Sequence, residues 1–281
     1  MKPDYIVLGA MKCGTTTLAA QLGALDGVFM TDPKEPCYFS DDPVYAKGPD
    51  WYAALFDGAE PDDIKGEAST HYTKRPQLPD TVARMTAALP EVRLIYMIRD
   101  PMARIVSHYI HEWSQRVLTA PLAAALESHT PLVDYSLYGR QITPFVEMYG
   151  ADAILLTSLE RWRQDPEAEL TRVARHIGFQ GTVTLASGDA ENVSAARSRK
   201  LPMHGLLVDN PVASALRRSL VPKSVRTWVR TARQRQDRPA IPADWIDALQ
   251  TRFADDRDIL AQVFPGDPSL DLAYPFLKDA A

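Results

Sequence analysis

The segment Asp4-Tyr-Ile-Val-Leu-Gly-Ala-Met-Lys-Cys-Gly-Thr-Thr-Thr-Leu-Ala-Ala20 joins an apolar run, a glycine-bounded turn and the beginning of a helix. The run from Tyr5 to Leu8 is short and rich in β-forming residues, which is typical of a buried parallel strand. The turn spans residues 9–14, and residues 15–22 follow as a helix. The first amide groups of a helix have no internal partner and its dipole favours negative charge, so this order predicts an anion site.

The turn also carries its own cation and hydroxyl groups. Lys12 lies inside it, and three threonines follow at residues 15–17. The loop of nucleoside triphosphatases places lysine after the second glycine and before serine or threonine, whereas Lys12 precedes Gly14 by two residues. We therefore expect this loop to hold a phosphate-like group. An ordinary tight strand-to-helix turn with an incidental lysine is the alternative.

Length and composition limit the class of protein. The chain has 281 residues, 46% hydrophobic and 24% charged, which suits one large α/β domain over residues 1–281. A net charge of −5 does not favour general nucleic-acid binding. Two cysteines, Cys13 and Cys37, are too few for a disulfide framework or a zinc site. The sequence shows no secretory segment and no apolar run of about 20 residues, so we expect a cytoplasmic, non-membrane protein with no detachable targeting segment.

Strand and helix patterns alternate along the chain, which predicts an α/β fold with a parallel sheet. Further strands are expected at residues 28–30, 92–98 and 153–157, and residues 64–72 are expected to begin as a short strand that runs into a loop. Helices are expected at residues 51–56, 79–89, 101–113, 166–177 and 242–264. Residues 121–150 are expected to form a helix that is interrupted near Pro144.

A second anion site is expected where the strand at residues 92–98 ends. Arg99 occupies that end, where ligands bind in open α/β sheets. Asp100 and Pro101 are suited to begin the next helix, and Ser107 lies two turns into it. The guanidinium N–H groups of Arg99 and the hydroxyl group of Ser107 can donate hydrogen bonds to one phosphate. The alternative is a structural cap made by Arg99 and Asp100, with Ser107 only packing.

A carboxylate also lies close in sequence to the first loop. Lys34 and Glu35 stand between Pro33 and Pro36, which break regular structure, so the pair is expected on a loop. Near a cationic site, Glu35 could accept the proton of an attacking hydroxyl group. A solvated ion pair is the alternative.

Two spaced anion sites on one sheet suit a ligand with anionic groups at both ends. Residues 7–17 resemble the 5′-phosphosulfate loop of sulfotransferases that use 3′-phosphoadenosine 5′-phosphosulfate (PAPS). Residues 94–109 resemble the 3′-phosphate element of that family. Lys34-Glu35-Pro36 with Tyr38-Phe39 is similar to the Lys-Glu-x-x-Phe-Phe loop of its carbohydrate branch, which includes heparan sulfate sulfotransferases. The resemblance, shared with bacterial members, covers about residues 4–205.

This resemblance implies a three-layer P-loop-like fold and transfer of a sulfuryl group from PAPS, as co-substrate and without a metal, to an acceptor hydroxyl. It implies that Glu35 is the general base, that Lys12 neutralises the leaving phosphate, and that Arg99 and Ser107 bind the 3′-phosphate. The 5′-phosphosulfate would be held by Lys12 and the amide groups of Cys13, Gly14, Thr15, Thr16 and Thr17. The acceptor would be a sugar, a glycolipid or a small natural product.

Two further stretches extend the resemblance more loosely. The basic residues Arg197, Arg199 and Lys200 resemble a Lys-Gly-Arg-Lys-type loop that covers the nucleotide phosphates, and a solvated basic loop is the alternative. Residues 66–72 resemble a Glu-Lys-Ser/Thr-Pro-x-Tyr segment, with Ala68 in place of the lysine. His71 and His108 are the reserve candidates for the base. Cys13 is expected to fill space in the loop, because no partner base lies nearby in sequence.

Residues 217–238 hold eight basic residues against one acidic residue. This segment could steer an anionic ligand, but a solvated or mobile segment explains it equally. Two other functions remain open at this point. A nucleotide kinase or hydrolase would need lysine directly before serine or threonine in the loop. A catalytically silent nucleotide-binding module would need no base, whereas Glu35 is present.

Overall fold

Five parallel strands form the central sheet of the computed structural model, which describes residues 1–186 and 238–278. In the order of the sheet they are β2 (Val28–Met30), β3 (Ile64–Glu67), β1 (Tyr5–Gly9), β4 (Arg93–Ile98) and β5 (Ile154–Ser158). Every neighbouring pair is parallel. The expected α/β fold with a parallel sheet between helices is confirmed.

The strand order places a topological switch point beside β1. After β1 the chain moves to β2 and β3 on one side, and it then crosses to β4 and β5 on the other side. The segments that leave β1 and β4 therefore diverge at their carboxyl ends. In open parallel sheets this crevice is where ligands bind, so the fold brings the two predicted anion sites to one edge.

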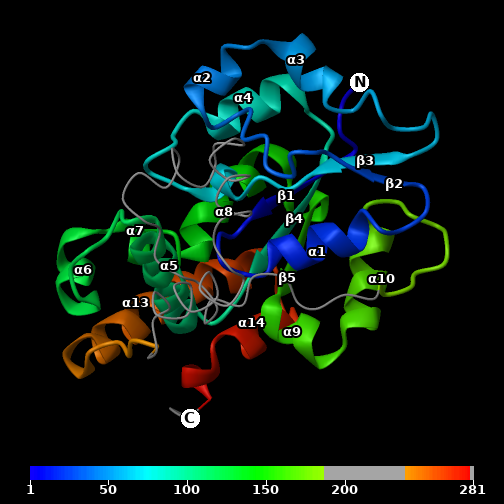
Figure 1. Ribbon diagram of the computed structural model, residues 1–281. Coiled ribbons are helices and arrows are strands. Elements are labelled where there is room, and N and C mark those ends of the chain that lie inside the picture. The colour runs from blue at the N-terminus through cyan, green and yellow to red at the C-terminus, as the bar shows by residue number, and fades with distance from the viewer. Residues whose placement is uncertain (187–237, 279–281) are drawn as a thin grey trace, which may run out of the picture.

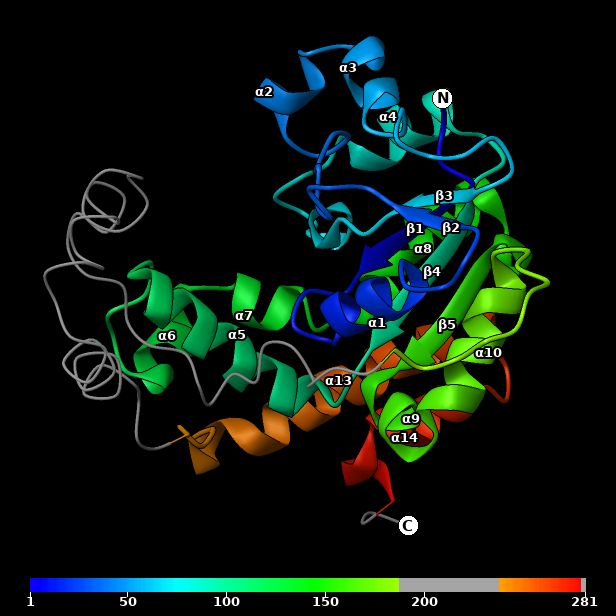
Figure 2. The same cartoon turned by 45° about the vertical axis from the view of Figure 1, so that its right-hand side comes forward.

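Helices cover both faces of the sheet (Figures 1 and 2). Helices α1 (Thr15–Leu22) and α10 (Pro166–His176) contact each other on one face. Helices α8 (Tyr138–Tyr149) and α13 (Ala243–Val263) pack together on the other face. Helix α5 (Pro101–Gln115) follows β4 and runs from the edge where the crevice lies.

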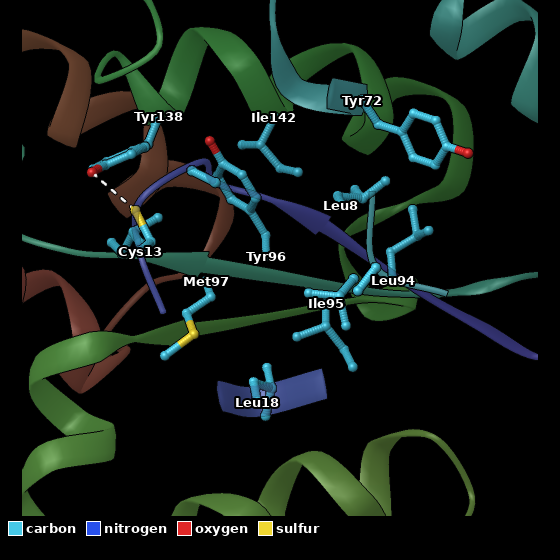
Figure 3. Close-up of a cluster of buried hydrophobic side chains, with 14 of the residues drawn as sticks. Leu8, Cys13, Leu18, Tyr72, Leu94, Ile95, Tyr96, Met97, Tyr138 and Ile142 are labelled. Atoms are coloured by element: carbon cyan, nitrogen blue, oxygen red, sulfur yellow. Dashed lines mark hydrogen bonds between the residues drawn. The ribbon is translucent and has the colours of Figure 1, made fainter. Parts of the chain in front are cut away.

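Side chains of β4 alternate between the two faces and join both helical layers to the sheet. Figure 3 shows Tyr96 on the same side of the strand as Tyr138 of α8, and Met97 on the side of Leu18 of α1. The rings of Tyr96 and Tyr138 meet edge to face with their centroids 6.2 Å apart. All four side chains are at most 1% exposed. Burial on both faces explains why the strand is an unbroken apolar run.

The remaining helices of the described residues lie around this core. They are α2 (Asp42–Tyr45), α3 (Pro49–Ala54), α4 (Thr81–Ala88), α6 (Leu122–Ser128), α7 (Pro131–Asp134), α9 (Leu159–Gln164) and α14 (Pro268–Ala273). Short 3₁₀ turns are η1 (Thr70–Thr73), η2 (Ala151–Ala153) and η5 (Pro275–Leu277). The described residues include no helix that is both long enough and apolar enough to cross a membrane.

One sequence expectation was wrong. Residues 121–150 form α6, α7 and α8, and α8 continues through Pro144 instead of breaking there. Ile142 and Phe145 flank the proline and are both 0% exposed, so burial on the sheet holds the helix together where one backbone hydrogen bond is missing. Helices α9 and α14 were not expected. A single domain over residues 1–281 stays a prediction.

Candidate active site

The loop between β1 and α1 is shaped by left-handed backbone conformations at two positions. Gly14 is the N-cap of α1 with φ of 98°, and Lys12 adopts φ of 72°. A Cβ atom at Gly14 would also lie 2.9 Å from Leu159 Cδ1, so glycine is required for conformation and for space. The turn delivers the first amide groups of α1 to the crevice, as the anion-site expectation requires.

Two arginines from the β4–α5 segment hold the carbonyl groups of this loop. Arg99 Nη1 donates to Lys12 O at 3.1 Å, and Arg104 Nε donates to Met11 O at 3.0 Å. Arg104 is 0% exposed and also donates to Leu132 O and Ser136 Oγ. The carbonyl groups of Met11 and Lys12 thus face guanidinium groups. Arg104 was missed from sequence, although it precedes Ser107 by three residues and shares the buried face of α5.

Arg99 lies where β4 ends, as expected from sequence, and is 9% exposed. Among the described residues, its buried Nε atom has no hydrogen-bond partner. An unpaired guanidinium N–H is costly to bury, so this atom is suited to an anionic ligand. Asp100 caps α5 by accepting from Met102 N at 2.9 Å, and Ser107 is buried on the same helix.

Lys34 connects two loops. One is the loop that carries Glu35, called the carboxylate loop below, and the other is the loop between β1 and α1, called the anion loop below. The Nζ atom of Lys34 lies 3.0 Å from Glu35 Oε1 and 3.4 Å from Thr16 Oγ1 at the start of α1. Thr70 of η1 donates to Glu35 Oε2 from its hydroxyl group at 2.9 Å and from its backbone N–H at 3.4 Å. The segments that follow β1, β2 and β3 therefore meet at the Lys34–Glu35 pair, and the side chain of Glu35 is 34% exposed.

Opposing effects act on the pKa of Glu35. Burial raises the pKa, but the Lys34 ammonium and the donors of Thr70 outweigh burial and lower the pKa below the usual value for glutamate. The side chain is therefore an ionised acceptor at neutral pH. A carboxylate in this state can take a proton from a neighbouring hydroxyl group.

The two reserve bases differ in their surroundings. His108 is 0% exposed, its Nε2 lies 2.9 Å from Glu112 Oε1, and burial lowers its pKa to about 4. Its ring stacks on Tyr135 with centroids 5.7 Å apart, so it is part of the packing. His71 is only partly buried, and burial also lowers its pKa.

Both cysteines are free thiols. Cys13 is 0% exposed, and burial raises its pKa to about 11. Its Sγ lies 3.5 Å from Tyr138 Oη, the contact drawn in Figure 3, and its backbone N–H donates to Ala10 O at 3.2 Å. A buried protonated thiol is no nucleophile, in keeping with the packing role expected from sequence.

A half-buried lysine near the carboxylate was also missed. Lys74 follows η1, its Nζ lies 6.0 Å from the centre of the Tyr135 ring, and burial lowers its pKa to about 8. The charges of Glu35 and Glu112 raise that pKa in part. In sequence Lys74 stands beside Arg75 after a loop motif, so only its surroundings distinguish it.

Some sequence predictions lie outside the described residues. Arg197, Arg199 and Lys200 do, as do residues 217–237 of the basic segment. Arg238, the last residue of that segment, donates from Nη2 to Ala103 O in the first turn of α5 at 3.4 Å. The positive charges of Arg99 and Arg163 add to burial in lowering its pKa. Within the described ranges 1–186 and 238–278, no group of three His, Cys, Asp or Glu side chains could hold a metal ion.

The chain is similar to known proteins in sequence and in fold. Residues 2–208 match the sequence model of the "Sulfotransferase domain" family. The chain is 34% identical over 130 residues to the membrane-associated sulfotransferase kil1 of Dictyostelium discoideum, covering 44% of this chain and 26% of that protein. It is 27% identical over 191 residues to mouse heparan sulfate glucosamine 3-O-sulfotransferase 3B1, covering 65% of this chain and 47% of that protein.

A solved structure shows the same fold along nearly the whole chain. The sulfotransferase from Alicyclobacillus acidocaldarius superposes with a TM-score of 0.68 at 20% identity, covering 96% of this chain and 98% of the other. The chain spans about a quarter to a half of the length of the curated relatives described above. The family model covers well over half of the residues, so the chain belongs to the sulfotransferase domain family.

Proposed function

We propose that the protein transfers a sulfuryl group from PAPS to a hydroxyl group of an acceptor. The observation that carries this proposal is the bridge made by Lys34 between Thr16, on the anion loop, and Glu35. The bridge keeps a carboxylate beside the loop suited to the phosphosulfate. An anion loop with a neighbouring general base is the arrangement that such a transfer needs.

In the proposed reaction the acceptor oxygen attacks sulfur while the bond from sulfur to the bridging oxygen of the 5′-phosphosulfate breaks. Glu35 takes the hydroxyl proton, and the products are a sulfate ester and 3′-phosphoadenosine 5′-phosphate (PAP). Lys12 and the amide groups at the start of α1 stabilise the charge that develops on the leaving phosphate. Arg99 and Ser107 bind the 3′-phosphate and align the donor.

Lys34 has a second effect in this proposal. Its ammonium lowers the pKa of Glu35, which keeps the base ionised but weakens it. The sulfuryl oxygens of bound PAPS compete for the same ammonium. Donor binding therefore raises the pKa of Glu35 and strengthens the base only when the donor is present.

A sugar hydroxyl is the acceptor that we favour. The relatives named heparan sulfate glucosamine 3-O-sulfotransferases act on a sugar by name, and the loop around Glu35 resembles that of the carbohydrate branch. Acceptor-binding loops vary within one fold, so this assignment rests on likeness to those relatives.

Calorimetric titration with PAP, compared with ATP and Mg²⁺, tests the donor. We expect tight binding of PAP without metal, and binding weaker by about tenfold or more in Lys12→Ala and in Arg99→Ala, since each loses a charge-assisted contact. Arg93→Ala is the matched control, because Arg93 lies at the opposite end of β4 and is exposed. Preference for Mg-ATP would replace this proposal with a nucleotide kinase or hydrolase.

A further inference from the structure

Glu67, at the end of β3, is a buried carboxylate held by hydroxyl donors alone. It is 0% exposed. Tyr52 and Tyr72 donate to its Oε1 atom at 2.7 and 2.8 Å, and Ser69 donates to Oε2 at 2.5 Å. Three O–H donors satisfy most of the acceptor sites of the carboxylate and offset part of the cost of burying it. A group enclosed in this way cannot touch a substrate.

Ser69 links Glu67 to the carboxylate loop through two hydrogen bonds. Its single hydroxyl hydrogen goes to Glu67, so the lone pairs of Oγ are free to accept, and Cys37 N–H donates to them at 3.0 Å. Donation to a carboxylate also polarises the hydroxyl and makes it a better acceptor. The Glu67–Ser69 pair therefore acts on the backbone two residues after Glu35.

The backbone at Cys37 needs such support. Cys37 has φ of 55°, a left-handed conformation that costs a residue other than glycine on the order of 1 kcal/mol. Its carbonyl accepts from Ser40 N and Asp41 N, and its N–H is held by Ser69. Strained backbone conformations persist only where several contacts determine them. Of these three hydrogen bonds of Cys37, the one with Ser69 comes from outside the carboxylate loop.

The segment after β3 also reaches Glu35 directly. Thr70, next to Ser69, donates twice to Glu35, and Ala68 N donates to Lys34 O at 3.0 Å. Residues 67–70 thus hold the carboxylate loop at Lys34, Glu35 and Cys37. Glu67 anchors this segment in the interior through the tyrosines of α3 and η1.

Resting on the proposed function, we propose that Glu67 is a positioning residue, which acts through Ser69 to fix the loop that carries the base Glu35. The ionised form of Glu67 suits this role. It accepts the hydroxyl hydrogen of Ser69, so the lone pairs of Ser69 Oγ are left to accept from Cys37 N–H. Protonated, Glu67 would present a donor to Ser69 Oγ, and the hydroxyl hydrogen of Ser69 would lose its acceptor. The base loop is then held less firmly.

The charge state of Glu67 changes near neutral pH. Burial raises its pKa to about 7 against the lowering effect of Ser69, Tyr52 and Tyr72, and the negative charge of Glu35 raises it further. The tyrosines stay protonated, because burial and Glu67 itself raise their pKa values well above the usual range. We therefore expect turnover to fall as pH drops through about 7, whereas in the protein without donor the pKa of Glu35 lies below its usual value.

Amide hydrogen exchange at Cys37, followed on the peptide of residues 34–40, tests the link without donor or acceptor. Glu67→Gln and Ser69→Ala should both speed exchange at Cys37 by about tenfold, a loss of protection that reports opening of the loop. Glu169→Gln is the matched control. Glu169 is also a buried carboxylate, 2% exposed and held by Thr157 and Arg172, but it lies in α10.

Kinetics separate positioning from a purely structural role. In Glu67→Gln we expect kcat to fall about tenfold, the KM for PAPS to stay unchanged, and the fall in rate near pH 7 to disappear. Glu169→Gln should keep that pH dependence. Folded Glu67→Gln with native exchange at Cys37 and an intact pH profile would overturn the proposal, and if that variant fails to fold, Ser69→Ala decides by the same exchange measurement.

The outcomes also distinguish this inference from the proposed function. Exchange at Cys37 needs no nucleotide, so faster exchange together with absent PAP binding would retain the Glu67–Ser69–Cys37 link and reject the sulfotransferase assignment. Tight PAP binding with unchanged exchange in both variants would reject the positioning role alone.

Discussion

At the scale of single residues, the candidate site is a set of contacts between loops that are far apart in sequence. Motif spacing was enough to select Lys12, Glu35 and Arg99 as candidates. It could not select Arg104, whose bond to Met11 O joins residues 93 positions apart. Nor could it reveal that Thr70 holds Glu35, because a threonine in a loop is common and its partner is set by the fold.

The identity of the base gives a prediction at this scale. Glu35→Gln keeps the size and the hydrogen bond to Thr70 but removes the proton acceptor, so kcat should fall by about 100-fold or more. Affinity for PAP, measured by calorimetry, should stay nearly unchanged.

His71→Ala is the companion variant, because His71 is the partly exposed reserve base. Native turnover in Glu35→Gln together with loss of turnover in His71→Ala would move the role of the base to His71. His108 is a poorer candidate, since burial lowers its pKa to about 4 and its ring is enclosed.

At the scale of elements, the two helices behind the sheet depend on one buried carboxylate. Asp256 of α13 accepts from Gly139 N at 2.7 Å and from Arg140 N at 2.9 Å, and so caps α8 from another helix. A Cβ atom at Gly139 would lie 2.4 Å from Asp256 O, which explains the glycine there. The cap and the burial of Phe145 together let α8 begin abruptly and continue past Pro144.

Loss of this cap should destabilise the protein. Asp256→Ala leaves two amide groups of α8 without a partner in a buried place, and we expect the free energy of unfolding to fall by about 1–3 kcal/mol. Urea denaturation measures this change. Asp255→Ala, at an exposed neighbouring position of α13, is the control and should change stability by less than about 0.5 kcal/mol. Equal effects of the two variants would remove the capping role.

At the scale of the whole molecule, burial of acids sets a pH dependence of stability. Burial raises the pKa of Glu67 from 4.5 to about 7 and that of Asp256 from 3.8 to about 6. Folding therefore favours their neutral forms, and the stability that they contribute is complete below their unfolded pKa values and is lost as pH rises through the folded ones. Glu35 acts in the opposite sense, with stability lost as pH falls below about 4.5.

Comparison with Glu67→Gln isolates one part of this dependence. Between about pH 4.5 and pH 7 the wild type should lose on the order of 3 kcal/mol of unfolding free energy relative to the variant, because a shift of one pKa unit corresponds to about 1.4 kcal/mol. Urea denaturation of both proteins across this range measures the difference. A difference that is independent of pH would mean that Glu67 does not titrate in this range.

The sequence by itself determined the parallel strands and most of the helices that flank them, and it was enough to nominate candidate residues for the crevice. Local patterns suffice there, because a buried strand, a glycine turn and a capped helix each depend on neighbouring residues, as at Tyr5–Gly9 and Asp100–Pro101. Only the tertiary structure decided the path of α8 through Pro144, the contact of Arg104 with Met11 O, and the hydrogen bonds that link Glu67 through Ser69 to Cys37. These depend on burial and on contacts between distant segments, and no local pattern encodes which buried group will meet which partner.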